Sequence, residues 1–212
     1  MRTLILMASL FFSLGISAQK DAKAKTILDR SSETYANSGD MTVSFTMSVK
    51  DVNSSMTSFD GEIRIKNEKF HFSTPDAETW FDGKTQWALM KQYKEVNVSE
   101  PSGSDIQAIN PSAIFNIYKK GCDYKLNGEK TDIKNRRVYE VELIPQGKSE
   151  MTRIVLQINK ADQIPVFFHI YYKNKFENLI FINKYTTKLN HPENLFVFDK
   201  SQHPDAEIID LR

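Results

Sequence analysis

Strict alternation of apolar and polar side chains begins at Met41 and constrains this chain more than any other feature. Apolar residues stand at Met41, Val43, Phe45, Met47 and Val49, and Thr, Ser or Lys stands at each position between or after them. A period of two places alternate side chains on opposite faces of a β-strand. The same alternation returns along the rest of the chain and indicates about eleven strands. We therefore expect a mainly β fold.

Turn sequences between the strands indicate how they pair. Asn53–Ser55 separates the first strand from a second that alternates around Ile63, so these two strands should form a long hairpin. Asp82-Gly83 and Asn127-Gly128 are further predicted turns. Strands in sequential order with short connections favour an antiparallel meander over a parallel sheet. A last short strand is predicted at Phe196 and Phe198.

Two segments have the spacing of amphipathic helices. One runs from Ala24, with Ile27, Leu28, Ser31 and Tyr35 on one face, and Asn37–Gly39 should end it. Pro111 opens the other, which carries Ile114, Phe115 and Tyr118 on one side and ends at Gly121. A large curved sheet would expose more apolar area than a soluble monomer usually tolerates. We therefore expect these helices to cover the open face of the sheet.

The first residues have the features of a secretory signal peptide. Arg2 precedes an apolar run, Leu4–Ile16, and the small residues Ser17 and Ala18 follow it. This run is about 13 residues long, well short of the ~20 that a membrane-spanning helix needs. We expect cleavage after Ala18 and one soluble domain over residues 19–212; a buried N-terminal helix is the alternative.

Charge, cysteine content and motifs exclude several classes of function. The 28 Lys and Arg nearly balance the 27 Asp and Glu, so no excess of positive charge is available for nucleic acid. A single cysteine, Cys122, excludes an internal disulfide and a zinc site built on several thiolates. The four histidines lack metal-binding spacing, and no nucleophile-elbow, Walker or dinucleotide motif occurs. The sequence therefore predicts no enzyme activity, no catalytic residue, no metal and no cofactor.

One stretch points to a family. The segment Trp80-Phe81-Asp82-Gly83-Lys84-Thr85-Gln86-Trp87, which follows the predicted strand Lys69–Phe72, resembles the periplasmic lipoprotein-carrier (LolA-like) family of bacteria. The tail, Asn194–Asp199 and then Ala206–Asp210, is similar to the closing part of that family. The resemblance implies an unclosed antiparallel half-barrel with helices packed into its concave side, where lipoprotein acyl chains are held.

The family function would make this protein a periplasmic carrier and chaperone that moves lipoproteins from the inner to the outer membrane. The partners implied are lipoproteins, an inner-membrane lipoprotein-releasing ABC transporter and an outer-membrane acceptor, with the carrier itself a monomer. Each wet methylene of an acyl chain costs ~0.8 kcal/mol, so such a carrier must offer an apolar surface. The candidate cargo-binding residues are Phe45, Met47, Phe70, Phe72, Trp87, Ile114 and Phe115.

Two alternatives stay open for these residues and for the function. The same side chains would also fill an ordinary core, and this holds for Phe70, which matches a family aromatic linked to cargo transfer. Lys66-Asn67-Glu68-Lys69 stands where the family has an Arg-Pro whose arginine holds the helical lid. Lys66 or Lys69 would replace that arginine weakly, because lysine lacks the planar fork of a guanidinium. The alternative functions are a module for another lipid or for envelope-stress sensing on the same fold, and an outer-membrane barrel, against which the predicted helices weigh.

Overall fold

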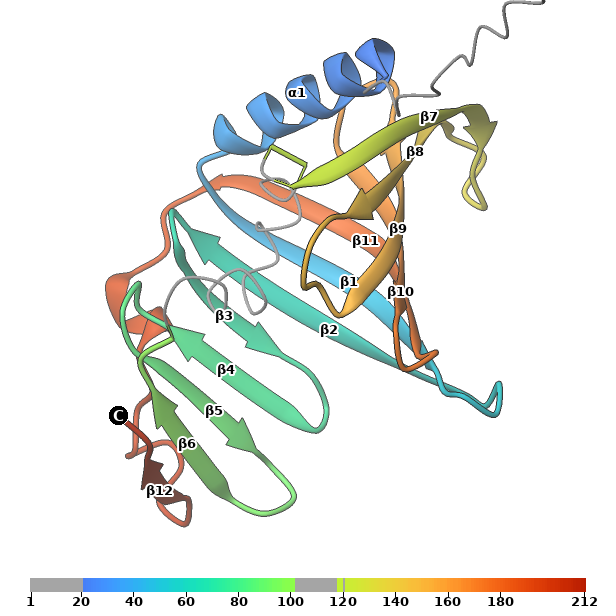
Figure 1. Ribbon diagram of the computed structural model, residues 1–212. Coiled ribbons are helices and arrows are strands. Elements are labelled where there is room, and N and C mark those ends of the chain that lie inside the picture. Colours follow the sequence, from blue (N-terminus) through green and yellow to red (C-terminus); the bar gives the residue numbers. More distant parts are fainter. Residues whose placement is uncertain (1–20, 102–117, 120) are drawn as a thin grey trace, which may run out of the picture.

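The computed structural model describes residues 21–101, 118–119 and 121–212. These residues form one strongly curved sheet with a helix across one end (Figure 1). The predicted signal peptide and most of the predicted helix from Pro111, including Ile114 and Phe115, lie outside the described residues.

The described part of the chain holds one α-helix, one short 3-10 helix and twelve strands, where about eleven had been predicted from the period of two. The helices are α1 (Ala22–Ala36) and η1 (Glu193–Phe196). The strands are β1 (Asp40–Lys50), β2 (Met56–Lys66), β3 (Lys69–Ser73), β4 (Ala77–Phe81), β5 (Gln86–Met90), β6 (Glu95–Ser99), β7 (Cys122–Thr131), β8 (Arg137–Pro145), β9 (Met151–Asn159), β10 (Pro165–Tyr172), β11 (Glu177–Leu189) and β12 (Glu207–Asp210).

The sheet is open and consists of two meanders rather than one. Its strand order is β12-β6-β5-β4-β3-β2-β1-β11-β10-β9-β8-β7, so β1 lies in the middle and pairs antiparallel with both β2 and β11. The expected antiparallel half-barrel is therefore present, whereas the expected sequential order fails at the step from β6 to β7. A short turn specifies only the next strand, and the second edge of β1 is left for a strand far along the chain.

Two local predictions were wrong. Phe196 and Phe198 were assigned to a strand, but Phe196 ends η1 and the last strand is β12, which pairs parallel with β6. Asn127-Gly128 was predicted to be a turn, but it lies inside β7 at a break in register between Leu126 and Gly128. Gly128 has a φ of +113° there, a conformation that glycine adopts without the strain of a side chain.

α1 begins at Ala22, two residues before its predicted start at Ala24, and ends at Ala36, just before the predicted stop at Asn37–Gly39. One carboxylate attaches it to the sheet. Asp21 accepts hydrogen bonds from the backbone N–H groups of Lys23 and Ala24 through Oδ1, at 2.8 and 3.1 Å, and so caps the helix. Its other oxygen accepts the backbone N–H of Leu126 on the edge strand β7, at 3.0 Å. Tyr118 donates to Asp29 at 2.9 Å and gives α1 a second attachment. Of the two predicted helices, α1 alone lies in the described part of the chain.

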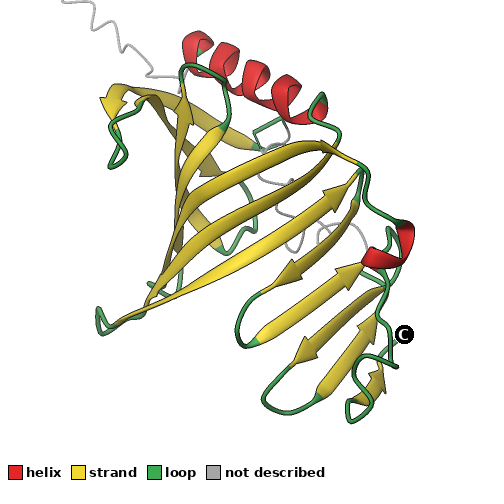
Figure 2. Cartoon of the chain, turned by 180° about the vertical axis from the view of Figure 1, so that it is seen from behind, coloured by secondary structure: helices red, strands yellow, loops and turns green. Residues whose placement is uncertain are grey.

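The buried apolar side chains form two clusters on opposite faces of the sheet. The main cluster joins α1 to the concave face of β1–β4 and β7–β11, with Leu28, Phe45, Phe70 and Leu156 among its members. The second lies on the outer face of β4–β6, where the C-terminal segment covers it (Figure 2). The sheet is thus supported from within by α1 and from outside by the chain end.

Candidate functional site: the apolar concave face

The concave face is densely packed near α1. Val43 and Phe45 on β1, Ile65 on β2 and Phe70 on β3 are buried there. Phe70 is 1% exposed, and its ring centroid lies 5.5 Å from that of Phe81 on the neighbouring strand. These side chains serve as the core beneath the helix.

Toward the opposite end of the sheet, apolar side chains continue on the same face but are only half-buried. We call this set the apolar rim: Met47, Phe59, Phe72, Met151, Tyr172 and Ile180. Met47 pairs with Phe59 on β2 and with Ile180 on β11, so the set crosses the middle of the sheet. Phe72 stacks on Phe45, with centroids 5.7 Å apart, and so joins the rim to the core.

The rim carries no charge. Its one ionisable side chain is Tyr172, and burial raises the pKa of that phenol, so it stays protonated. Asn178 donates to the Tyr172 hydroxyl at 3.1 Å. Flexible Met and flat Phe side chains can repack around ligands of irregular shape. The rim is therefore chemically suited to hydrocarbon chains.

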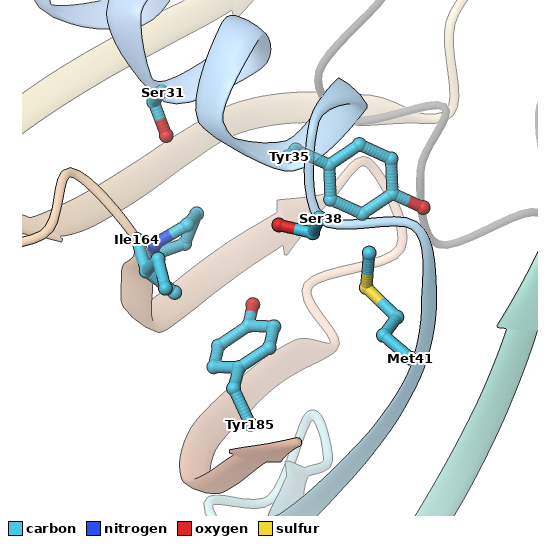
Figure 3. A pocket seen from close by; sticks show the side chains of 7 residues that line it. Ser31, Tyr35, Ser38, Met41, Ile164 and Tyr185 are labelled. Carbon is cyan, nitrogen blue, oxygen red and sulfur yellow. The ribbon is translucent and has the colours of Figure 1, made fainter. Parts of the chain in front are cut away.

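A small pocket lies between α1 and the sheet (Figure 3). Its lining residues are Ser31, Tyr35, Ser38, Met41, Ile164, Pro165 and Tyr185. Its cavity volume is only about 10 Å³, which is about enough for one water molecule. Ser31 is 1% exposed, and its hydroxyl has no hydrogen-bond partner within the described ranges. The pocket is too small for an acyl chain and marks looser packing beneath the helix.

The structure separates the candidate cargo-binding residues. Phe45 and Phe70 lie in the core, and Met47 and Phe72 lie in the rim next to it. Trp87 faces the other side of the sheet and packs against the second cluster, which also contains Trp80 and Phe198. The cargo-binding roles of all these residues remain predictions. Phe59, Met151, Tyr172 and Ile180 were not among the candidates. The period-2 pattern places Phe59, Tyr172 and Ile180 on apolar strand positions, whereas Met151 is out of phase with Ile154 and pairs with Tyr172 only after a shift in register.

Lys66 and Lys69, considered as substitutes for a lid-holding arginine, bind the C-terminal segment. Lys66 donates to the backbone carbonyl of His191 at 2.6 Å and forms an ion pair with Glu193 at 3.0 Å. Lys69 reaches the other oxygen of Glu193 at 2.5 Å. The two ammonium groups, Lys69 foremost, lower the pKa of the Glu193 carboxyl. Both lysines therefore fasten η1 to the β2–β3 turn.

In residues 21–101, 118–119 and 121–212, no group of three or more His, Cys, Asp or Glu side chains is placed to hold a metal ion. No helix in those ranges is both long and apolar enough to cross a bilayer.

Comparison with known proteins identifies the family. Residues 14–171 match the family model described as "Outer membrane lipoprotein carrier protein LolA". The chain belongs to the LolA family. The match ends within β10, before β11 begins, so the tail segments that carry the resemblance, Asn194–Asp199 and Ala206–Asp210, lie beyond it. No curated protein matches the chain.

Solved structures share this LolA-type fold at low sequence identity. An uncharacterized conserved protein from Thermus thermophilus is 14% identical, with a TM-score of 0.59, covering 89% of this chain and 99% of its own. LprF from Mycobacterium bovis is 15% identical, with a TM-score of 0.50, covering 82% of this chain and 97% of its own. These likenesses concern the fold.

Proposed function

We propose that this LolA-family protein is a periplasmic carrier that binds lipoprotein acyl chains on the apolar rim and moves lipoproteins from the inner to the outer membrane. The observation that carries the proposal is the uncharged row of half-buried side chains, Phe59, Met47 and Ile180, which continues the buried core on the concave face. In this role the protein performs no covalent chemistry of its own.

The energetics of transfer favour such a surface. Each acyl methylene that moves from water onto an apolar surface contributes ~0.8 kcal/mol, so a chain of ordinary length gains several kcal/mol from partial cover. A carrier must also release its cargo, and contact through half-buried Met and Phe side chains is weaker than enclosure in a tight pocket.

Location and partners complete the proposal. The apolar run Leu4–Ile16 supports export through a cleaved signal peptide. The description of the matching family supports lipoproteins as cargo. An inner-membrane lipoprotein-releasing ABC transporter would supply them and an outer-membrane acceptor would receive them.

The test compares a rim variant with a surface variant. Phe72→Glu places a carboxylate at a half-buried position, where an arriving acyl chain would remove its remaining hydration, so it should weaken binding of a diacylated cysteine peptide at least tenfold. Ile133→Glu, at a turn residue that is 80% exposed, is the matched control and should bind normally. Equal binding by both variants, with melting temperatures unchanged, would refute the role of the rim.

A second candidate function keeps the fold but changes the task to sensing another lipid or envelope stress. Lys66 and Lys69 favour it, because their bonds to His191 and Glu193 leave them unavailable to hold a lid in the manner of the family arginine. Incubation with spheroplasts separates the two functions. A carrier releases lipoproteins from the inner membrane into solution, whereas a sensor binds lipid without releasing them.

A further inference from the structure

The concave face changes character between β3 and β5. Cross-strand pairing places three rows of side chains on this face of β4, β5 and β6: Phe81, Gln86 and Ser99; Thr79, Ala88 and Asn97; and Ala77, Met90 and Glu95. The outer face of the same strands carries Trp80, Leu89, Val96 and Val98 beneath the C-terminal segment. Here the sheet has its apolar side outward and its polar side inward, the reverse of β1 and β2.

Four of the inward side chains are neutral groups that both donate and accept hydrogen bonds. We call Thr79, Gln86, Asn97 and Ser99 the polar strip; all four are half-buried. Within the described ranges, neither the Gln86 nor the Asn97 side chain has a hydrogen bond. Phe72 of the rim pairs directly with Thr79, so the strip begins where the rim ends.

We propose that the polar strip binds the peptide segment that follows the acylated residue of a lipoprotein while the acyl chains lie on the rim. This inference rests on the proposed function and extends it from the acyl chains to the peptide. A peptide presents N–H and C=O groups in alternation, and amide and hydroxyl side chains can pair with both.

Charge selects a peptide over a phosphate head group. None of the nine inward positions on β4–β6 is Lys or Arg, and one is the acid Glu95. An anion on this surface would lose hydration and gain no charged partner, which is unfavourable. A neutral or basic peptide has no such penalty.

The size of the strip sets the length of peptide it can hold. Neighbouring strands lie ~4.8 Å apart, so the distance from β4 to β6 is about 10 Å. An extended peptide advances ~3.3 Å per residue, so the strip matches about three residues. The inference therefore concerns the first residues after the lipid.

The experiment uses three probes that share the same two acyl chains. They are an S-dipalmitoylglyceryl cysteine followed by Ser-Gly-Ser-Gly, dipalmitoylglycerol alone, and dipalmitoyl phosphatidylglycerol. The wild-type full chain should bind the lipopeptide about tenfold more tightly than dipalmitoylglycerol. Asn97→Ala and Gln86→Ala should each weaken lipopeptide binding about five- to tenfold and change dipalmitoylglycerol binding less than twofold. Gln92→Ala, on the exposed β5–β6 turn, is the matched control and should change neither.

Each outcome decides between the two proposals. Wild-type protein that binds none of the probes refutes the proposed function and this inference together. Equal wild-type affinity for lipopeptide and dipalmitoylglycerol leaves acyl binding intact and refutes the polar strip, and this comparison holds even if a variant fails to fold. Variants that weaken the phosphatidylglycerol probe selectively would assign the strip to a lipid head group and overturn the inference.

Discussion

The ring of Phe45 lies against the backbone of Gly61, the residue directly opposite it on β2. A Cβ atom built on Gly61 would sit 2.4 Å from Cζ of that ring. Phe45 is 5% exposed and also stacks on Phe72, so it has little room to move. A glycine at this point of the strand lets the aromatic layer lie close to the sheet.

Gly61→Ala should therefore destabilise the protein. The added methyl group forces the Phe45 ring off its position, and overpacking of this kind costs about 1–3 kcal/mol. Urea unfolding measures the change. In a Phe45→Leu background the same substitution should cost clearly less, because the ring is gone; an equal cost in both backgrounds would show that the contact with Phe45 is not the cause.

Phe70 and Phe72 should respond differently to truncation. Phe70→Ala empties a fully buried site and should cost about 3–5 kcal/mol, whereas Phe72→Ala at the half-buried rim should cost less than half as much. Phe72→Ala should instead weaken acyl binding. Thermal melts and lipopeptide titrations on both variants check this, and a Phe70→Ala protein that melts like wild type would contradict the assignment of Phe70 to the core.

Asp21 should link the stability of α1 to pH. The N–H groups of Leu126 and Ala24 lower the pKa of its carboxyl. The stabilisation from the ionised Asp21 carboxylate is therefore fully present above the ordinary aspartate pKa of ~3.9. It is lost as the pH falls through the lowered pKa that Asp21 has in the folded protein. Asp21→Ala removes the cap and should cost about 0.5–2 kcal/mol at neutral pH.

Asp21→Asn separates the two roles of that carboxylate. The amide keeps one oxygen that can cap α1. Its other group is an NH2, which is a donor and cannot accept a hydrogen bond from the Leu126 N–H. Hydrogen exchange at Leu126 should accelerate in Asp21→Asn while the exchange of Ala24 changes less. Unchanged protection at Leu126 would mean that α1 is attached to β7 by other contacts.

Glu193 should hold the C-terminal segment in place without adding much to global stability. Its side chain is 62% exposed, so solvent screens its ion pairs with Lys66 and Lys69, and Glu193→Gln should leave the urea midpoint of unfolding close to that of the wild type. The pKa of Glu193 is lowered in the folded protein, so its ion pairs hold the C-terminal segment at pH values above the usual glutamate pKa. This hold is lost when acidification protonates the carboxylate. Limited proteolysis after β11 should accelerate in Glu193→Gln and in high salt. Glu68→Gln, on the exposed β2–β3 turn, is the control and should be cleaved like wild type.

Local features of the fold could be predicted because neighbouring residues determine them. Alternation around Phe45 and Ile63 is enough to identify β1 and β2, and Asn53–Ser55 turns one into the other. The end of α1 before Gly39 and the turn at Asp82-Gly83 were confirmed for the same reason. The period of two even predicts which side chains share a face of each strand.

The arrangement of the apolar surface depended on contacts between distant segments. The alternation indicates that one face of a strand is covered, but it does not identify the segment that covers it. The pairing of β1 with β11 and the contact of Trp87 with the cluster beneath the C-terminal segment therefore could not be predicted from it. It also treats Phe70 and Phe72 alike, although one lies beneath α1 and the other at the rim. By itself the sequence determined most of the strands, several of the turns between them and the lipoprotein-carrier resemblance. Only the tertiary structure decided which apolar residues are core and which can meet a ligand, because burial depends on the whole curved sheet and on the segments packed against each of its faces.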